Sequence, residues 1–339
     1  MQTSSYSAAV EDPRVSARRV FGLVANELAL VEEEFERQAR SNIQVIAYLG
    51  EYLRASGGKR VRPALCILSI NAVGGDASTT RSIRMATVME FLHTATLVHD
   101  DIIDNAETRR GSASVNSRFG NQTAVLMGDW LYMSAFETSL AERSLPILDI
   151  LTCLTRKMTE GELVQLTMLG RTDIDEEKYL DILQRKTAYL FSACCEIGAL
   201  MGGANEAYRH ALRDYGMNLG IAFQLVDDLL DFTANEGVLG KAAGADLLEG
   251  KLTLPLILLL KDRPHLRSEF QEIMRDGSYK SFSRERLVDA LDEVGALDRT
   301  RQRAYSYTEA ARQSLMVLHE SKYRDALMSL PSYIIERKK

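Results

Sequence analysis

Apolar residues recur every three or four positions along most of the chain, which is the period of an amphipathic helix. Between residues 15 and 40 they occupy positions 20, 23, 24, 28, 31 and 35, among acidic residues and arginines. Comparable patterns predict helices over 43–55, 63–73, 79–104, 121–141, 145–169, 175–201, 205–232, 252–261, 284–294 and 298–318. Asp298 is expected to be the N-cap of the last of these helices.

The residues that separate these patterns support the same fold class. The six prolines, at positions 13, 63, 146, 255, 264 and 331, fall at the edges of the patterns or in the C-terminal tail, so the helix interiors are free of them. The sequence shows neither strand alternation nor a hairpin signal. We therefore expect an all-α fold in a single domain, residues 14–339, after a flexible N-terminal tail, residues 1–13.

Composition and charge exclude several classes of protein. With 339 residues, 46% of them apolar, the chain can bury a substantial core. A net charge of −6 argues against a partner that is a nucleic acid or an anionic membrane. The four cysteines lack metal-site spacing, the N-terminus lacks a secretory signal pattern, and the most apolar run is too short to span a membrane. These features favour a cytoplasmic protein.

Two aspartate motifs carry the first candidate chemistry. The first aspartate motif comprises Asp100, Asp101 and Asp104, and the second comprises Asp227, Asp228 and Asp231. Residues i and i+4 of a helix share a face, so the outer aspartates of each motif point the same way and the middle one flanks the same cavity. Clustered carboxylates repel one another. A divalent cation removes that repulsion, and oxygen ligands favour Mg²⁺.

A solvated acidic surface is the ordinary explanation of one such motif. Two copies, each after a mostly apolar run, favour a metal site. Basic residues near the motifs point the same way. The turn over 57–63 places Lys59, Arg60 and Arg62 at a helix start, where anions bind well.

Further cations follow the two motifs along the chain. Arg109 and Arg110 begin five residues after the first motif. Lys186 precedes Thr187 inside an apolar helix, where a buried lysine needs an anionic partner. Lys241 and Lys251 lie on glycine-containing loops after the second motif, with Asp246 between them. Each group alone is compatible with a solvated turn, but together they indicate that a metal and several cations hold one polyanion.

The chain offers no Ser-His-Asp arrangement and no Walker-type glycine loop as an alternative chemistry. A metal, a diphosphate and a dry apolar cavity suffice for the departure of diphosphate from an allylic carbon. His93 lies seven residues before Asp100, two helical turns back on a similar face, and is either an anion contact or a core histidine. His99 caps or supports the first motif.

These motifs resemble those of the trans-prenyltransferase family, the polyprenyl diphosphate synthases, over nearly the whole chain after about residue 14. The matching segments are 57–63, 99–104 with 109–111, 128–129, 186–187, 223–231 and 239–255. The resemblance implies an isoprenoid synthase-type fold, which is an antiparallel helical bundle around a central cavity. It also implies a homodimer.

The resemblance assigns a role to each candidate residue. Both aspartate motifs would bind Mg²⁺ and, with Lys186, carry catalysis. Isopentenyl diphosphate would be held by Lys59, Arg62, His93 and Arg110. The allylic diphosphate would be held by Arg109, Lys186, Thr187, Gln224, Lys241 and Lys251.

The implied reaction is a Mg²⁺-dependent condensation, in trans, of isopentenyl diphosphate with an allylic diphosphate. The growing product should pass Thr96 and Ala95, four and five positions before Asp100. Both are small, whereas family members with short products commonly carry an aromatic residue there, so we expect a long-chain product, octaprenyl- or solanesyl-like. Ala95 could instead be a helix-packing alanine. The floor of the cavity is expected on helix 121–141, at Met133, Phe136 and Leu140.

Three alternatives remain open at this point. A short-chain synthase, making farnesyl or geranylgeranyl diphosphate, would share all of the motifs. A class I terpene cyclase would lack the turn over 57–63 and would not need the second aspartate motif. A non-catalytic subunit of a heteromeric synthase would be expected to have lost carboxylates or arginines, and none is lost here.

Overall fold

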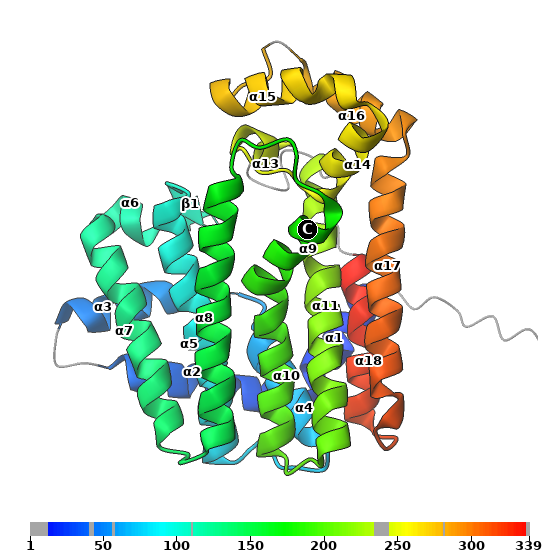
Figure 1. Cartoon of the computed structure of the whole chain (residues 1–339). Helices are drawn as coiled ribbons and strands as arrows, with labels where there is room; N and C mark the ends of the chain where they lie inside the picture. Colours follow the sequence, from blue (N-terminus) through cyan, green and yellow to red (C-terminus); the bar gives the residue numbers. More distant parts are fainter. Residues whose placement is uncertain are drawn as a thin grey trace, which may run out of the picture.

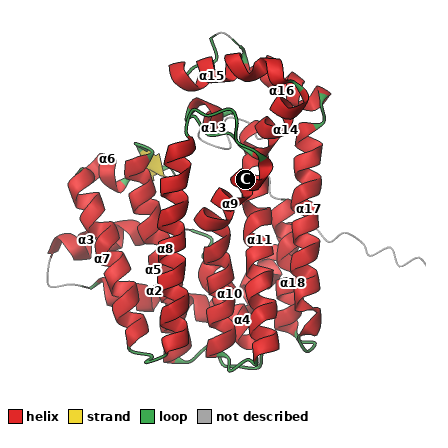
Figure 2. Cartoon of the chain, viewed as in Figure 1, coloured by secondary structure: helices red, strands yellow, loops and turns green. Residues whose placement is uncertain are grey.

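The computed structural model describes residues 13–40, 44–55, 58–109, 111–233, 244–280 and 282–336. The described residues are almost entirely helical, as Figure 2 shows, which confirms the predicted all-α class. The N-terminal helices are α1 (Pro13–Leu23), α2 (Ala25–Ala39), α3 (Gln44–Ala55), α4 (Val61–Ala72), α5 (Thr80–Ile103), α6 (Val115–Phe119), α7 (Asn121–Leu140) and α8 (Leu145–Met168). Among all of the described residues, no helix is both long and apolar enough to cross a membrane.

The second half of the chain continues the bundle and adds a cap. It contains α9 (Glu176–Leu183), the π-helical turn η1 (Gln184–Ala188), α10 (Tyr189–Met201), α11 (Glu206–Thr233), α13 (Ala245–Leu248), α14 (Leu254–Asp262), α15 (Arg267–Asp276), α16 (Arg284–Glu293), α17 (Ala296–Ser314) and α18 (Lys322–Ile335). Two 3₁₀ turns, η2 (Pro264–Leu266) and η3 (Leu315–Val317), complete it. In Figure 1, α13 to α16 lie beyond the upper ends of the long helices.

The centre of the bundle is formed by α4, α5, α10 and α11, which pack on one another. In α5, side chains are buried on every face along most of the helix, as is typical of a helix enclosed by others. Thr79 caps its N-terminus by accepting a hydrogen bond from the Ser82 backbone. Both α5 and α11 run from the lower to the upper end in Figure 1, so the two aspartate motifs end up at the same end of the bundle.

The structure corrects four details of the sequence analysis. The predicted helix over 15–40 is broken at Val24, which is fully buried and leaves helical geometry at φ −122°. Asp298 is not the N-cap of α17. Gly295 takes that place because it adopts the left-handed conformation, at φ 63°. Pro331 lies inside α18 rather than in a tail, and burial of its ring offsets part of the lost helical hydrogen bond.

The fourth correction is a small hairpin after α5. Strand β1 (Thr108–Arg109) pairs antiparallel with β2 (Ser112–Ala113). Gly111, at φ 79°, provides the left-handed residue that so short a connection needs. Strands of two residues are too short to show alternation, which is why no periodic pattern announced them. The predicted tail, residues 1–13, falls outside the described residues except for Pro13, which begins α1.

Candidate active site

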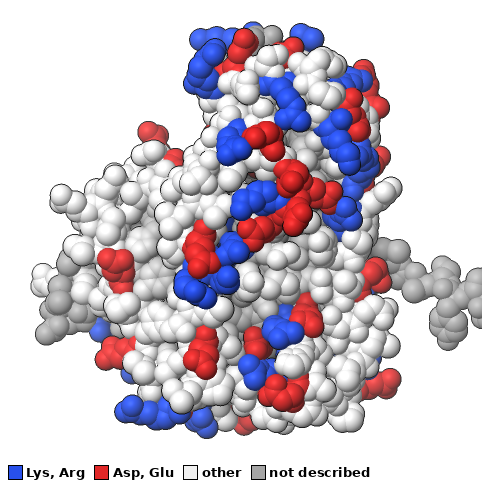
Figure 3. Space-filling view, in the orientation of Figure 1, with Lys and Arg blue, Asp and Glu red and all other residues white. Residues whose placement is uncertain are grey.

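A cavity of about 730 Å³ opens between the upper ends of α5, α8, α9 and α11. Its lining includes residues from both aspartate motifs, namely Asp100 of the first and Asp227 and Asp228 of the second. Lys186 lines the same cavity. The two aspartate motifs, 127 positions apart by their numbering (227 − 100), therefore meet at one site. We call this space the main cavity. In Figure 3, acidic and basic side chains crowd together in the middle of the face, whereas the part formed by α7 is largely uncharged.

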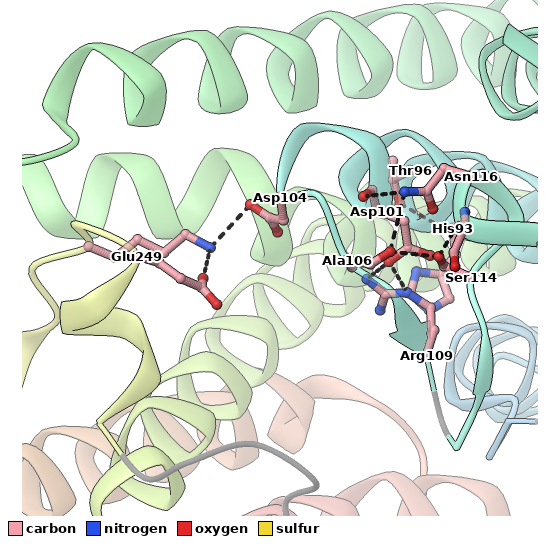
Figure 4. Close-up of polar contacts among 11 residues, drawn as sticks. His93, Thr96, Asp101, Asp104, Ala106, Arg109, Ser114, Asn116 and Glu249 are labelled. Carbon is pink, nitrogen blue, oxygen red and sulfur yellow. Dashed lines mark hydrogen bonds and ion pairs between the residues drawn. The ribbon is translucent and has the colours of Figure 1, made fainter. Parts of the chain in front are cut away.

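The three aspartates of the first motif differ in their surroundings. Burial raises the pKa of Asp100 to about 7, and the neighbouring Glu162 adds to the rise while Lys186 opposes it. Asp101 points away from the main cavity and is 2% exposed. Its Oδ1 accepts from Nε of Arg109 at 2.6 Å (Figure 4). Arg109 thus pairs with the motif in this structure.

Asp104 is exposed and connects the first motif to the loop after α13. The ammonium of Lys251 lies 3.3 Å from Asp104 Oδ1 and 2.7 Å from Glu249 Oε2 (Figure 4). Burial lowers the pKa of Lys251, but Asp104 and Glu249 outweigh it and the net direction is upward. Lys251 therefore stays charged beside the aspartates, where an anionic ligand could reach it.

The second motif is buried more deeply. Asp228 is 4% exposed and accepts hydrogen bonds from the Tyr179 hydroxyl and, at 3.0 Å, from Nε2 of Gln224. Burial, with Asp246 nearby, raises the pKa of Asp228 to about 8. Asp231 accepts from the Ala245 backbone N–H at 3.1 Å, and burial raises its pKa to about 7.

These carboxylates fit a divalent cation. Among the described residues, Asp231 Oδ2 is buried and has no hydrogen-bond partner, which is costly for a carboxylate oxygen. In the described part of the chain, no group of three or more His, Cys, Asp or Glu side chains is already arranged to hold a metal ion. In proteins, Mg²⁺ is usually held by one or two carboxylates plus substrate phosphates.

Two of the residues predicted to hold the allylic diphosphate are presented by the π-helical turn η1. Both Lys186 and Thr187 line the main cavity. Lys186 Nζ is paired with Glu162 Oε1 of α8 at 2.7 Å. The Thr187 hydroxyl donates to Oε1 of Gln224 at 3.0 Å. Wide π-turns frequently occur at functional sites.

Sequence reasoning missed Glu162 and Tyr179. Glu162 belongs to the helix α8, which also carries Asp149 and Glu160, and no motif distinguishes it from them. Tyr179 could have been found, because it precedes Lys186 by seven residues and so shares a face with it.

The segment 128–129 matters because of a close helix contact. A Cβ added to Gly128 of α7 would lie 2.2 Å from Nε2 of His99. The His99 ring therefore occupies the space of the missing side chain, and the same nitrogen lies 3.5 Å from Asp129 Oδ1. His99 supports the first motif by filling the contact between α5 and α7, in line with the supporting role considered for it.

A second cavity, of about 450 Å³, adjoins the first and is lined by Lys59, Arg62 and His93. Arg62, His93 and Phe223 line both cavities. The Arg62 guanidinium lies 4.7 Å from the ring centroid of Phe191 and 5.5 Å from that of Phe223. Three of the four residues predicted to hold isopentenyl diphosphate are thus brought together.

Arg60, between two of these residues, has a different role. It adopts the left-handed conformation at φ 49° before α4. Its guanidinium pairs with Glu32 of α2 and, at 2.6 Å, with Glu90 of α5. Arg60 also belongs to the lining of the second cavity, with Lys59 and Arg62, but its two ion pairs fix the turn. Two of the predicted diphosphate contacts, Arg110 and Lys241, lie outside the described residues. So does Gly57, the first residue of the turn over 57–63.

The residues expected along the product path separate into two groups. Thr96 lines the main cavity, whereas Ala95 is fully buried and is not part of the lining. The expected floor is wrong for Met133 and Leu140, which are 61% and 47% exposed. They lie on the outer face of α7, because a helix shows only one face to the cavity, and that face presents Tyr132. Phe136 is half-buried against the core.

Comparison with known proteins identifies the family. The model of the family described as "Polyprenyl synthetase" matches residues 43–291. Octaprenyl diphosphate synthase of Escherichia coli (strain K12) is 37% identical over 328 residues, which cover 95% of this chain and 99% of that protein.

Solved structures agree with that assignment. A decaprenyl diphosphate synthase from Rhodobacter capsulatus is 33% identical, with a TM-score of 0.89 over 95% of this chain and 99% of that one. A polyprenyl synthase from Caulobacter crescentus CB15, complexed with calcium and isoprenyl diphosphate, is 35% identical, with a TM-score of 0.89 over 95% and 98% of the two chains. The predicted isoprenoid synthase-type helical fold is confirmed. The chain belongs to the polyprenyl synthetase family and is a prenyltransferase.

Proposed function

We propose that the protein condenses isopentenyl diphosphate with an allylic diphosphate, in trans, and repeats the reaction to make a long-chain polyprenyl diphosphate. The observation that carries this proposal is the arrangement of the two cavities. One is lined by Lys186 and by aspartates of both motifs, namely Asp100, Asp227 and Asp228. The other, which shares a wall with it, is lined by Lys59, Arg62 and His93. Two diphosphates could therefore be bound side by side with their chains in contact.

The aspartates would serve two purposes. Asp100, Asp104, Asp227 and Asp231 would bind Mg²⁺, while Asp101 and Asp228, which are held by hydrogen bonds, would fix the motifs. Bound Mg²⁺ supplies positive charge that stabilises the departing diphosphate. Oxygen ligands alone suit Mg²⁺ and the similar hard cations.

The chain's own cations would divide the remaining work. Lys186, Thr187 and Gln224 would hold the allylic diphosphate, with Arg109, Lys241 and Lys251 around them. As the carbon–oxygen bond of that substrate breaks, Lys186 would stabilise the charge on the leaving oxygen. Apolar residues of the main cavity, such as Leu97, Ile182 and Leu190, would keep water from the allylic cation.

Lys59, Arg62, His93 and Arg110 would orient isopentenyl diphosphate so that its double bond faces that cation. A new carbon–carbon bond forms, and a proton leaves the isopentenyl unit for the diphosphate. The product, longer by one unit, would then occupy the main cavity as the next allylic substrate.

A long-chain product is supported by the relatives and by the cavity wall. The similar proteins named above include an octaprenyl and a decaprenyl synthase. Thr96, on the wall one helical turn before Asp100, is small and leaves the path open.

A homodimer is supported by the outer face of α7. Val125, Leu126, Met133 and Leu140 are 42%, 68%, 61% and 47% exposed. Leu126, Met133 and Leu140 recur every seven residues, so they form a stripe along one side of the helix. An exposed apolar stripe of this kind suits a second copy of the chain. Light scattering should give twice the chain mass for the wild type and a lower mass for Met133→Lys with Leu126→Lys.

The reaction is tested by incubating the pure protein with isopentenyl diphosphate, farnesyl diphosphate and Mg²⁺ and sizing the products. We expect chains well beyond C20 and none from Asp227→Ala. Products of C15 or C20 would indicate the short-chain alternative. A cyclic hydrocarbon made without isopentenyl diphosphate would indicate a cyclase, and no product would indicate a non-catalytic subunit.

A further inference from the structure

Tyr179 is a buried tyrosine that meets the second aspartate motif without belonging to it. It lies on α9, is 7% exposed, and lines the main cavity. Its hydroxyl donates a hydrogen bond to Oδ2 of Asp228.

This contact closes a chain of hydrogen bonds between two helices. The Thr187 hydroxyl donates to Gln224 Oε1, and Gln224 Nε2 donates to Asp228 Oδ1, each at 3.0 Å. Tyr179 occupies the other oxygen of the same carboxylate. Both ends of the chain, Tyr179 and Thr187, lie on the segment α9–η1, and the middle lies on α11.

The segment α9–η1 also carries Lys186, which lies one residue before Thr187. A shift of α11 along this segment would move Asp227 relative to Lys186. The hydrogen bonds at Asp228 oppose such a shift from both sides, because one comes from the first half of the segment and one comes, through Gln224, from the second half. Tyr179 supplies the only direct bond from α9 to Asp228 that is seen among the described residues.

We propose that Tyr179 is a positioning residue, which fixes Asp228 and thereby holds the metal-binding face of the second motif in register with Lys186 and Thr187. The inference rests on the proposed function and deepens it, since it adds a residue that acts through Asp228. Without the hydroxyl, Asp228 turns toward the space it leaves, and the site loses affinity for the metal and the allylic diphosphate together. The isopentenyl diphosphate subsite, built on α4 and α5, is unaffected.

The test compares Tyr179→Phe with Tyr215→Phe. Tyr215 is also buried, and its hydroxyl donates to the backbone carbonyl of Leu327 at 2.7 Å. Each variant loses one hydroxyl from a buried ring, but only the first loses a bond to the second motif. A purely structural role for Tyr179 predicts that the two variants behave alike.

The first readout is calorimetric binding of inorganic diphosphate in the presence of Mg²⁺, which needs no turnover. A hydrogen bond to a charged group is worth about tenfold in affinity or more, so we expect Tyr179→Phe to bind about tenfold more weakly. Tyr215→Phe should bind like the wild type. Equal affinity of Tyr179→Phe and the wild type would overturn the inference.

The second readout is steady-state kinetics on the same variants. Tyr179→Phe should raise the KM for the allylic diphosphate and the Mg²⁺ concentration for half-maximal rate, each by about tenfold, and leave the KM for isopentenyl diphosphate unchanged. Equal rises in both KM values would also overturn it. Failure of the proposed function is seen separately, as absence of product from the wild type, and the calorimetric comparison still decides the role of Tyr179.

Discussion

Asp101 and Asp228 stand at the same position of the two aspartate motifs, yet different kinds of group hold their carboxylates. Asp101 is paired with the guanidinium of Arg109, at 2.6 Å. Asp228 accepts from two uncharged donors, Tyr179 and Gln224. The first motif thus carries a counter-ion of its own, whereas the donors of the second orient its carboxylate without neutralising it.

The helices that carry the motifs also differ one turn earlier. Four residues before Asp100 stands Thr96, which is small and lines the main cavity. Four residues before Asp227 stands Phe223, whose ring lines both cavities and lies against Arg62. The small Thr96 leaves space in the main cavity beside α5, whereas the Phe223 ring of α11 separates the two cavities. The same spacing of aspartates therefore occurs on a helix that leaves room for the product and on a helix that divides the two cavities.

The largest effect is expected where the motifs act together. Asp100→Ala and Asp227→Ala should each lower turnover by about a hundredfold or more, since each removes a ligand that helps to stabilise the leaving diphosphate. Excess chelator should abolish the activity of the wild type. Asp173→Ala, at an exposed carboxylate paired with Arg171, is the control and should keep full activity. Undiminished turnover in chelator would contradict the metal assignment.

A change at Arg109 tests whether the first motif depends on its counter-ion. Arg109→Met leaves the buried Asp101 carboxylate without its cation, and we expect a loss of about 2–3 kcal/mol in the free energy of unfolding, from denaturant titration. Arg171→Met removes the cation of an exposed pair and should leave the denaturation midpoint unchanged. If Arg109→Met and Arg171→Met both unfolded like the wild type, the pair of Asp101 with Arg109 would not stabilise the fold. The proposed difference between Asp101 and Asp228 would then be contradicted.

Product length tests the difference between the helices. Thr96→Phe should shorten the product, because the ring would enter the main cavity on the side that is open. Ala95→Phe should shorten it as well, and since Ala95 is fully buried we also expect a loss of about 1–3 kcal/mol from overpacking. Met316→Phe, at a side chain of η3 that is 58% exposed, is the control and should leave the product unchanged. If Thr96→Phe and Ala95→Phe both gave products of unchanged length, the growing chain would not pass along this part of α5.

The smallest effect concerns the stability of the metal-free protein. Burial, and to a smaller extent the charge of Glu162, raises the pKa of Asp100 to about 7. An aspartate in the unfolded chain has a pKa of about 3.9. The unfolded state therefore releases its proton at lower pH, and stability falls as pH rises from about 4 to 7. Asp100→Asn removes this cost, so in chelator it should raise Tm by a few degrees at pH 8 and by less at pH 5.

Asp101→Asn provides the matched comparison for that experiment. It breaks the pair with Arg109, so it should lower Tm at pH 8, where Asp100→Asn raises it. A rise in both variants would show that the two carboxylates of the first motif are equally unfavourable in the metal-free protein.

The sequence alone could place the helices and the two motifs because both depend on local periodicity. The helix predicted over 79–104 agrees to within one residue at each end with α5, which spans Thr80–Ile103. The break at Val24 could not be predicted, since it depends on burial against other helices and the residue itself favours no break. The π-turn at η1 likewise carries no signature, because its residues are ordinary helix formers.

The candidate site shows the same limit. Spacing alone placed Asp100 and Asp104 on one face, but it could not show that Asp101 would meet Arg109, since the hairpin that returns Arg109 to α5 is too short to be seen in a pattern. Glu162 was missed because its pairing with Lys186 joins helices that are distant in sequence. Motifs name the residues that carry chemistry, whereas their counter-ions come from the tertiary fold.

Arg62 lies in the wall of both cavities, and this position has a thermodynamic consequence. A guanidinium between two anion subsites contributes to the potential at each of them. An anion bound on one side changes the field that the other experiences, and by linkage the second anion changes the affinity of the first by the same factor. A substitution at Arg62 should therefore change the affinity for both proposed substrates.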